Sequence, residues 1–240
     1  PAGWLHSGPI LARMNQPVHS KVAAPEAPAK AGRTNDPART MAEILAVATH
    51  EFADKGLSGA RIDEIAAATR TSKRMIYYYF GSKDGLYLAV LEDAYRRMRH
   101  IESDLHLDDL PPVEALAALV RFTYAHHRDN EDFVRLVMNE NMMRGQYLSQ
   151  SRNLRQVNER AIESVRALYE RGVASGVFRA GLDPVDIHAT ISALTFFNVS
   201  NRYSFGFIFQ DRASPGKAET LDAEQVVALV LRYVGHNKTQ

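Results

Sequence analysis

The sequence predicts an all-α protein, with a small N-terminal helix-turn-helix domain followed by a larger helical bundle. Three observations favour this fold class. Apolar residues recur at helical spacing through most of the chain. No stretch shows the sustained alternation of apolar and polar residues that a half-buried strand requires. Capping residues and helix-stopping Gly and Pro residues divide the chain into segments of helical length.

The first helices are predicted from their caps and apolar spacing. Asp36 and Pro37 suit a helix start, and Gly56 suits its end. A short helix follows around 62–66, then a tight turn at 69–71 and a third helix from Ser72 to about Tyr78. A long helix starts near residue 83, and five more are expected over 113–127, 131–143, 151–174, 184–209 and 222–235.

These helices imply three parts. Residues 1–34 are rich in Ala, Pro and Lys and are expected to form a disordered arm, in which Met14 leaves open whether residues 1–13 belong to the natural protein. Residues 35–91 are expected to form the helix-turn-helix domain, and residues 92–240 the bundle. Within the bundle, residues 211–219 are expected to form a flexible loop.

Composition is that of a soluble globular protein. Of the 240 residues, 45% are hydrophobic and 24% are charged, so a sizeable core can form. The absence of Cys excludes disulfides, thiolate metal sites and cysteine nucleophiles. The longest apolar stretch, around 187–201, is too short and too polar to span a bilayer, and no basic residue leads into an apolar run at the start. We therefore expect a cytoplasmic protein with no signal peptide and no membrane contact.

Charge is unevenly distributed along the chain. Residues 1–83 contain 11 Lys and Arg against 7 Asp and Glu, whereas residues 84–240 contain 18 against 21. Between Arg70 and Lys83 there are four basic residues and no acidic one. A local basic patch of this kind on a short helix indicates a polyanionic partner for the N-terminal part of the chain.

The run from 52 to 91 resembles the DNA-binding domain of the TetR (tetracycline-repressor-like) family of bacterial transcription regulators. The resemblance is strong over about 38–91, and beyond that it rests on length and helical pattern. It implies a homodimer that binds an operator in double-stranded DNA, with a small-molecule effector in the C-terminal bundle. The residues that carry it are Phe52, Gly56, Ile62, Ile65, Ala66, Ser72, Tyr77, Phe80, Ser82, Lys83 and Leu86.

The expected DNA contacts follow from helix-turn-helix geometry. Ser72 can cap the third helix, so its next residues meet base edges in the major groove. Arg74 has the fork geometry for guanine O6 and N7, and Met75 can touch a thymine methyl group. Other members of the set suit phosphates, including a lysine at a helix start. The DNA-binding candidates are Arg70, Thr71, Ser72, Lys73, Arg74, Met75, Tyr77, Tyr78 and Lys83.

Four positions depart from the family pattern. Ala60 and Arg61 stand where the family has Thr or Ser, so the cap of the second helix must come from Ser58, Gly59 or solvent. The turn has Arg70 in place of Gly. Either Arg70 takes a positive φ there, which costs of order 1 kcal/mol, or the turn differs slightly from that of the family. Thr71 replaces the usual Val.

The C-terminal helices predict dimerisation and a pocket. Helices 184–209 and 222–235 are apolar around most of their circumference, and a charge at Val227 or Leu231, whichever faces outward, is expected to give monomers. Polar residues within such helices need a partner, which is either protein or an anionic or carbonyl-rich ligand. For Asn201 and Arg202, pairing with acidic residues across the dimer is an equal alternative. The ligand candidates are Phe122, His126, Asn139, Asn141, Tyr147, Phe197, Asn198, Asn201 and Arg202.

Two other function classes remain open. One is a helical-bundle enzyme or carrier with a helical adaptor, and the other is a module whose basic patch binds an acidic protein. The sequence offers no convincing catalytic pair, and adjacent His126 and His127 point apart on a helix. We therefore expect no enzyme activity, no cofactor and no metal site. Salt-dependent, sequence-selective DNA binding discriminates the three classes.

Overall fold

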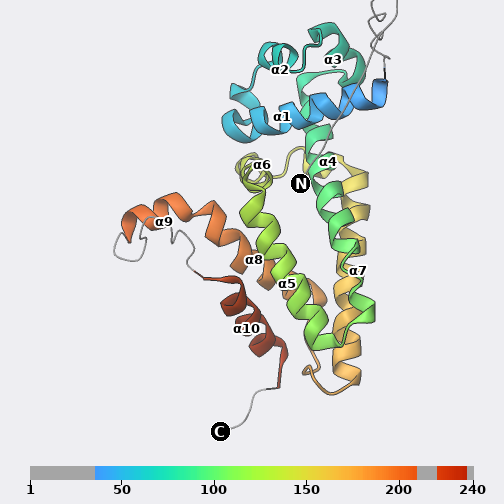
Figure 1. Cartoon of the computed structure of the whole chain (residues 1–240), viewed down its shortest axis with the longest axis vertical. Coiled ribbons are helices and arrows are strands. Elements are labelled where there is room, and N and C mark those ends of the chain that lie inside the picture. The colour runs from blue at the N-terminus through green and yellow to red at the C-terminus, as the bar shows by residue number, and fades with distance from the viewer. Residues whose placement is uncertain (1–35, 210–220, 237–240) are drawn as a thin grey trace, which may run out of the picture. The chain divides into compact units, whose positions relative to one another are not determined.

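The computed structural model describes residues 36–209 and 221–236, and these form helices without a strand (Figure 1). The predicted all-α class is confirmed. The predicted arm, residues 1–34, and the predicted loop, residues 211–219, lie outside the described residues. The helices are α1 (Pro37–Gly59), α2 (Ile62–Ala68), α3 (Lys73–Phe80), α4 (Lys83–Ser103), α5 (Pro112–Asp129), α6 (Glu131–Met142), α7 (Arg152–Ala174), α8 (Pro184–Ser200), α9 (Arg202–Ile208) and α10 (Ala223–Val234), with short 3-10 turns at Leu107–Asp109 and Leu148–Gln150.

Helices α1, α2 and α3 pack together against the start of α4, and we call them the reading head (Figure 1). The Asp36 carboxylate caps α1 by accepting hydrogen bonds from the N–H groups of Ala38 and Arg39, as predicted. Gly56 has φ +66°, which interrupts α1 before its last residues. The left-handed conformation costs glycine little, since it has no Cβ.

The start of α2 has no side-chain cap. Its N-cap residue is Arg61, whose side chain makes no capping hydrogen bond, while Ser58 and Gly59 belong to the end of α1. The Arg61 N–H donates to Glu51 Oε1 on α1 at 3.0 Å. The two expected protein caps are therefore not used, and a carboxylate of the neighbouring helix holds the α2 entry instead.

The helix predicted over 184–209 is two helices, which is a correction. Asn201 leaves helical geometry, with φ −108° and ψ 2°, so that it ends α8 and begins α9. Its amide nitrogen donates to Ser200 Oγ at 2.8 Å, and the adjacent Arg202 pairs with Glu131 of α6. Apolar composition predicted a continuous helix because it contains no information on these local and tertiary bonds.

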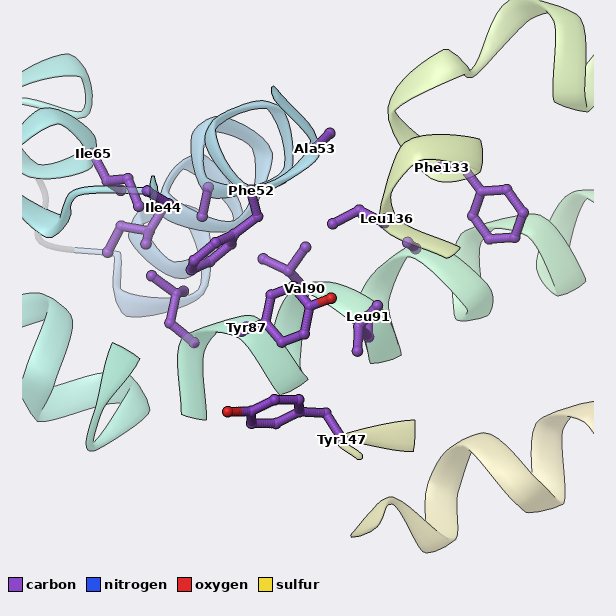
Figure 2. Close-up of a cluster of buried hydrophobic side chains, with 14 of the residues drawn as sticks. Ile44, Phe52, Ala53, Ile65, Tyr87, Val90, Leu91, Phe133, Leu136 and Tyr147 are labelled. Atoms are coloured by element: carbon purple, nitrogen blue, oxygen red, sulfur yellow. The ribbon is translucent and has the colours of Figure 1, made fainter. Parts of the chain in front are cut away.

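Two hydrophobic clusters form the core. One consists of residues of α5, α7, α8 and α10. The other begins in the reading head, continues along α4 and includes Phe133 and Leu136 of α6 and Tyr147. In this second cluster the Tyr87 ring lies between Phe52 and Tyr147, with centroids 5.1 Å and 5.2 Å apart (Figure 2). The reading head and the first part of the bundle thus share one continuous core.

Candidate DNA-reading surface and effector site

Helix α3 presents a polar face opposite a buried anchor. Ser72 Oγ accepts a hydrogen bond from the Met75 N–H at 3.2 Å, so the predicted cap is present. Ile76 is fully buried, whereas Lys73 and Arg74 are exposed on the first turn and Met75 is half-buried. This amphipathic arrangement anchors the helix through a buried apolar side chain and exposes Lys73 and Arg74 at the surface.

The turn before α3 is tight and strained. Arg70 has φ +51°, a conformation that favours glycine. The Thr71 N–H donates to the Ala66 carbonyl at 3.0 Å, and Thr69 Oγ1 donates to the Ile65 carbonyl at 2.8 Å. These bonds hold the turn in place. As a result, Arg70 is exposed beside the start of α3.

The basic residues of this surface differ in their partners. Arg70 and Arg74 make no ion pair with any residue of 36–209 or 221–236. Lys73 pairs with Asp63 of α2, which the sequence analysis did not anticipate, and Lys83 Nζ lies 3.4 Å from the Ser58 carbonyl oxygen. The two arginines are therefore the cations most readily available to a polyanion.

Two tyrosines extend the polar surface of α3. Tyr78 is 77% exposed and Tyr77 is 44% exposed, while Phe80 packs partly against the core. Phe52 and Ile65, expected behind the recognition helix, are fully buried. The exposed hydroxyl-bearing rings are consistent with the predicted phosphate contacts, which remain predictions.

An ionic cluster braces α1 against α2. Lys55 Nζ lies 2.7 Å from Glu64 Oε2 and 2.9 Å from Glu51 Oε2. The hydrogen bond to Glu64, followed by that to Glu51, raises the pKa of Lys55 to about 12. Lys55 therefore stays charged throughout the physiological range and is neutralised by its two acids, which leaves it a structural role within the reading head.

Most of the polar ligand candidates have partners within the chain. The Asn139 amide donates to the Phe52 carbonyl at 3.1 Å, and the Asn141 amide donates to the Val137 carbonyl at 2.8 Å. Asn198 bonds the Leu221 backbone twice, donating to its carbonyl at 2.9 Å and accepting from its N–H at 3.3 Å. Protein groups therefore satisfy the hydrogen-bonding needs of these side chains, which is one of the two alternatives that the sequence leaves open.

Arg202 pairs with Glu131 of its own chain. One alternative from the sequence was that Arg202 pairs with an acidic residue across a dimer. The aromatic candidates are spread over different regions. Tyr147 is buried beside Tyr87, Phe122 packs against the same cluster, and Phe197 is 40% exposed on α8. The nine candidates thus do not converge on one cavity, and their role in ligand binding stays a prediction.

His126 is different from the other candidates. It is 8% exposed, and its Nε2 atom is buried without a hydrogen-bond partner among residues 36–209 and 221–236. Burial, followed by repulsion from Arg99 and Arg97, lowers its pKa to about 4. His126 also lies on the wall of a cleft of about 560 Å³ between α1, α4 and the α5–α6 turn. This volume is in the range of small-molecule sites.

Several buried polar residues were not selected from the sequence. Glu140 is fully buried, and its Oε1 accepts hydrogen bonds from the N–H groups of Tyr147 at 2.6 Å and Leu148 at 2.9 Å. Arg99 pairs with Glu102 and donates to Asn158 of α7 at 3.2 Å. Charged residues on the inward face of an otherwise apolar helix are the sequence signal that marks such positions.

A second cleft, of about 660 Å³, lies between α4 and the start of α7 and is lined by residues that include Tyr95, Arg155 and Asn158. None of the nine ligand candidates lines it.

None of the described helices combines the length and apolar character that a membrane span needs.

Comparisons with known proteins agree with this geometry. The family model for bacterial regulatory proteins of the tetR family matches residues 44–90, and the model for a tetracyclin repressor-like C-terminal domain matches residues 112–230. The HTH-type transcriptional repressor NicS of Pseudomonas putida is 36% identical over 166 residues, covering 69% of this chain and 78% of that protein. The HTH-type transcriptional repressor SCO4008 of Streptomyces coelicolor is 32% identical over 146 residues, covering 60% and 72%.

Solved structures share the fold. A tetR-family regulatory protein from Rhodococcus RHA1 matches with a TM-score of 0.63 and 20% identity, over 82% of this chain and 97% of that one. The regulator SCO4942 from Streptomyces coelicolor matches with a TM-score of 0.60 and 23% identity, over 81% and 98%. The chain belongs to the TetR family of bacterial regulatory proteins, and it is a ligand-responsive, DNA-binding transcriptional repressor.

Proposed function

We propose that two copies of this chain bind a palindromic operator through their α3 helices and that a small molecule releases them. The observation that carries the proposal is the pair of exposed arginines without ion-pair partners, Arg70 and Arg74, beside the Ser72 cap. Cations placed at the start of a recognition helix supply both base and phosphate contacts. A protein that binds chromosomal DNA in bacteria acts in the cytoplasm.

In this proposal the contacts divide between bases and backbone. Arg74 and Met75 read base edges, while Arg70, Tyr77 and Tyr78 bind phosphates. Lys73 also binds a phosphate, which replaces its partner Asp63. Lys83 also binds a phosphate, which replaces its contact with the Ser58 carbonyl. Such an exchange is accessible because both lysine contacts lie at the protein surface, where an ion pair contributes at most about 1 kcal/mol.

The dimer surface is proposed on α8 and α10. Exposed apolar residues recur every fourth position along α8, and Leu229 of α10 is 40% exposed. Of the two positions expected to test the dimer, Val227 is 5% exposed and faces the core, and Leu231 is half-buried. We define the α8 stripe as Val185, Ala189, Ala193 and Phe197. A second copy that covers the stripe removes an apolar surface from water.

The effector is proposed to bind between α4 and the helices that follow it, at a site that includes His126. Its binding favours an arrangement of the two reading heads that does not match the operator. Operator and effector then oppose each other, and each weakens the binding of the other by the same factor.

The experiment is selection of bound sequences from a random duplex library, followed by footprinting with the full chain. Arg74→Ala is expected to weaken binding by about 1–3 kcal/mol and to relax specificity at one or two base pairs. Arg166→Ala, an exposed arginine of α7, is the matched control and is expected to change neither. Failure of the wild-type chain to select any sequence, or an unchanged footprint for Arg74→Ala, contradicts the proposal.

A further inference from the structure

The 560 Å³ cleft joins the reading head to the bundle. Its walls come from α1, through Thr49 and His50, from α4, through Arg97 and Ile101, and from the turn between α5 and α6. Hydrogen bonds cross the same junction nearby, because Arg135 of α6 donates to the Ala53 carbonyl of α1 at 2.9 Å. Anything that fills the cleft therefore touches both parts of the molecule.

One contact indicates where the proton lies on the His126 ring. The Asn130 amide nitrogen donates to the His126 carbonyl oxygen at 2.9 Å. The same nitrogen lies 3.5 Å from His126 Nδ1. Because an amide nitrogen only donates, this contact favours the tautomer with the ring proton on Nε2. In that tautomer the buried Nε2–H has no acceptor among the described residues, and such a group costs about 1–3 kcal/mol.

The imidazole is held in place by aromatic rings. Phe133 meets it edge-on with centroids 5.2 Å apart, and Phe122 lies 5.8 Å away on its own helix. Because its pKa is lowered to about 4, His126 is neutral at pH 7. The wall of the cleft therefore includes a neutral imidazole that aromatic rings hold in place.

The charged residues of the cleft are already compensated. Arg97 lies 3.1 Å from Asp93, and His50 lies 3.2 Å from Asp132. The remaining acids of the wall are Asp129, which pairs with Arg128, and Glu131, which pairs with Arg202. A charged ligand would have to compete with these partners, whereas a neutral ligand avoids that cost.

We propose that this cleft binds a small neutral molecule with an apolar body and a carbonyl oxygen, and that this oxygen accepts a hydrogen bond from His126 Nε2. The apolar body lies against Ala94, Ile101 and Phe133, which line the same cleft. Such a ligand satisfies the one unpartnered buried donor of the wall, and it contacts α1 and the α5–α6 turn at once.

The consequence for DNA binding rests on the proposed function. A ligand in the cleft stabilises one relative arrangement of α1 and α6, and so it shifts the population of reading-head orientations. The ligand site itself does not depend on that step, because binding is measurable without DNA.

The test uses the full chain with 15N-labelled histidine and three neutral carbonyl probes, namely benzamide, acetophenone and 2-piperidone. Ethylbenzene serves as the apolar control. Long-range proton–nitrogen NMR spectra are expected to show the Nε2-protonated tautomer of His126, and at least one carbonyl probe is expected to shift its Nε2 signal while ethylbenzene leaves it in place. His126→Phe is expected to weaken binding of that probe about tenfold, the loss of one hydrogen bond.

Two further variants keep the test decisive. Ile101→Trp fills the cleft from a position that is half exposed, so it is expected to abolish probe binding in a folded protein. His100→Phe, an exposed histidine of α4 outside the cleft, is expected to bind the probe as the wild type does. A proton on Nδ1, no response to any carbonyl probe, or equal affinity for wild type, His126→Phe and Ile101→Trp overturns the proposal.

Operator binding is measured separately on the same preparation. Probe binding through His126 in a protein that selects no DNA supports the ligand site and contradicts the proposed function alone. If the protein binds its operator but gives any of the contradicting NMR outcomes, only the proposed ligand site is overturned.

Discussion

At the scale of single residues, Glu140 has a structural role in the core, although glutamate usually lies at the protein surface. It is fully buried, and one of its oxygens holds two backbone N–H groups of the segment after α6. Burial, followed by the nearby Glu140 carboxylate, raises the pKa of the Tyr87 hydroxyl. The carboxylate thus fastens Tyr147 and the following turn to the shared core.

Glu140→Ala is expected to lower the free energy of unfolding by about 3 kcal/mol, because two buried N–H groups lose a charged acceptor. Glu140→Gln keeps one acceptor oxygen and is expected to cost less. Urea denaturation followed by circular dichroism measures both. Glu163→Ala, an exposed position on α7, is the control. Equal stability of Glu140→Ala and the control would show that the bonds to Glu140 contribute little.

Arg70 combines strain with a predicted DNA contact, so two substitutions separate the effects. Arg70→Gly removes the Cβ at φ +51° and is expected to raise the free energy of unfolding by up to about 1 kcal/mol. Arg70→Ala keeps the strain. Both are expected to weaken DNA binding alike and to lower its salt dependence by one phosphate contact. Thermal unfolding and salt titrations measure these outcomes, and unchanged DNA affinity in both variants refutes the phosphate contact.

At the scale of helices, α5 and α8 are joined by histidines that are held neutral. His127 Nδ1 lies 2.9 Å from Thr195 Oγ1, and the nearby His188 is also largely enclosed. Burial is the main cause that lowers the pKa of His127 and of His188 to about 4 each, as it does for His126. Protonation of these rings is therefore coupled to unfolding.

The sign follows from the direction of the pKa shifts. In the unfolded chain these histidines titrate near pH 6.5, so between pH 6.5 and 4 the unfolded state binds more protons than the folded state. The melting temperature is expected to be steady above about pH 7 and to fall as the pH drops from 6.5 to 4. His127→Phe is expected to reduce the slope because one titrating group is removed. A slope that is the same in His127→Phe and wild type contradicts the assignment for His127.

At the scale of the whole molecule, the proposed dimer surface depends on the exposed α8 stripe. Ala193→Glu places a charge on the α8 stripe without touching the core, because Ala193 is exposed. It is expected to give a folded monomer that has lost operator binding, since two half-sites are no longer read together. Sedimentation velocity at micromolar concentration measures the change in mass. Glu163→Ala is again the control, and a monomeric wild-type chain would exclude this interface.

The amino-acid sequence is sufficient to predict the all-α class, the Asp36 and Ser72 caps, a tight turn before α3 and the resemblance to the TetR family. These features depend on residues within one or two helical turns of each other, where spacing and capping chemistry are sufficient. The polar surface of α3 followed from the same local rules, although the pairing of Lys73 with Asp63 did not.

Tertiary structure alone decided the break at Asn201, the partners of the buried amides and the position of His126 on a cleft. Asn198 is satisfied by Leu221 and Asn139 by Phe52, and both partners lie far away in the sequence. An amide in an apolar helix looks the same whether a ligand or a distant carbonyl satisfies it, because periodicity reports burial and does not report the partner. Only the packed structure shows that these amides have partners, whereas Nε2 of His126, on the wall of the cleft, has no hydrogen-bond partner among the described residues.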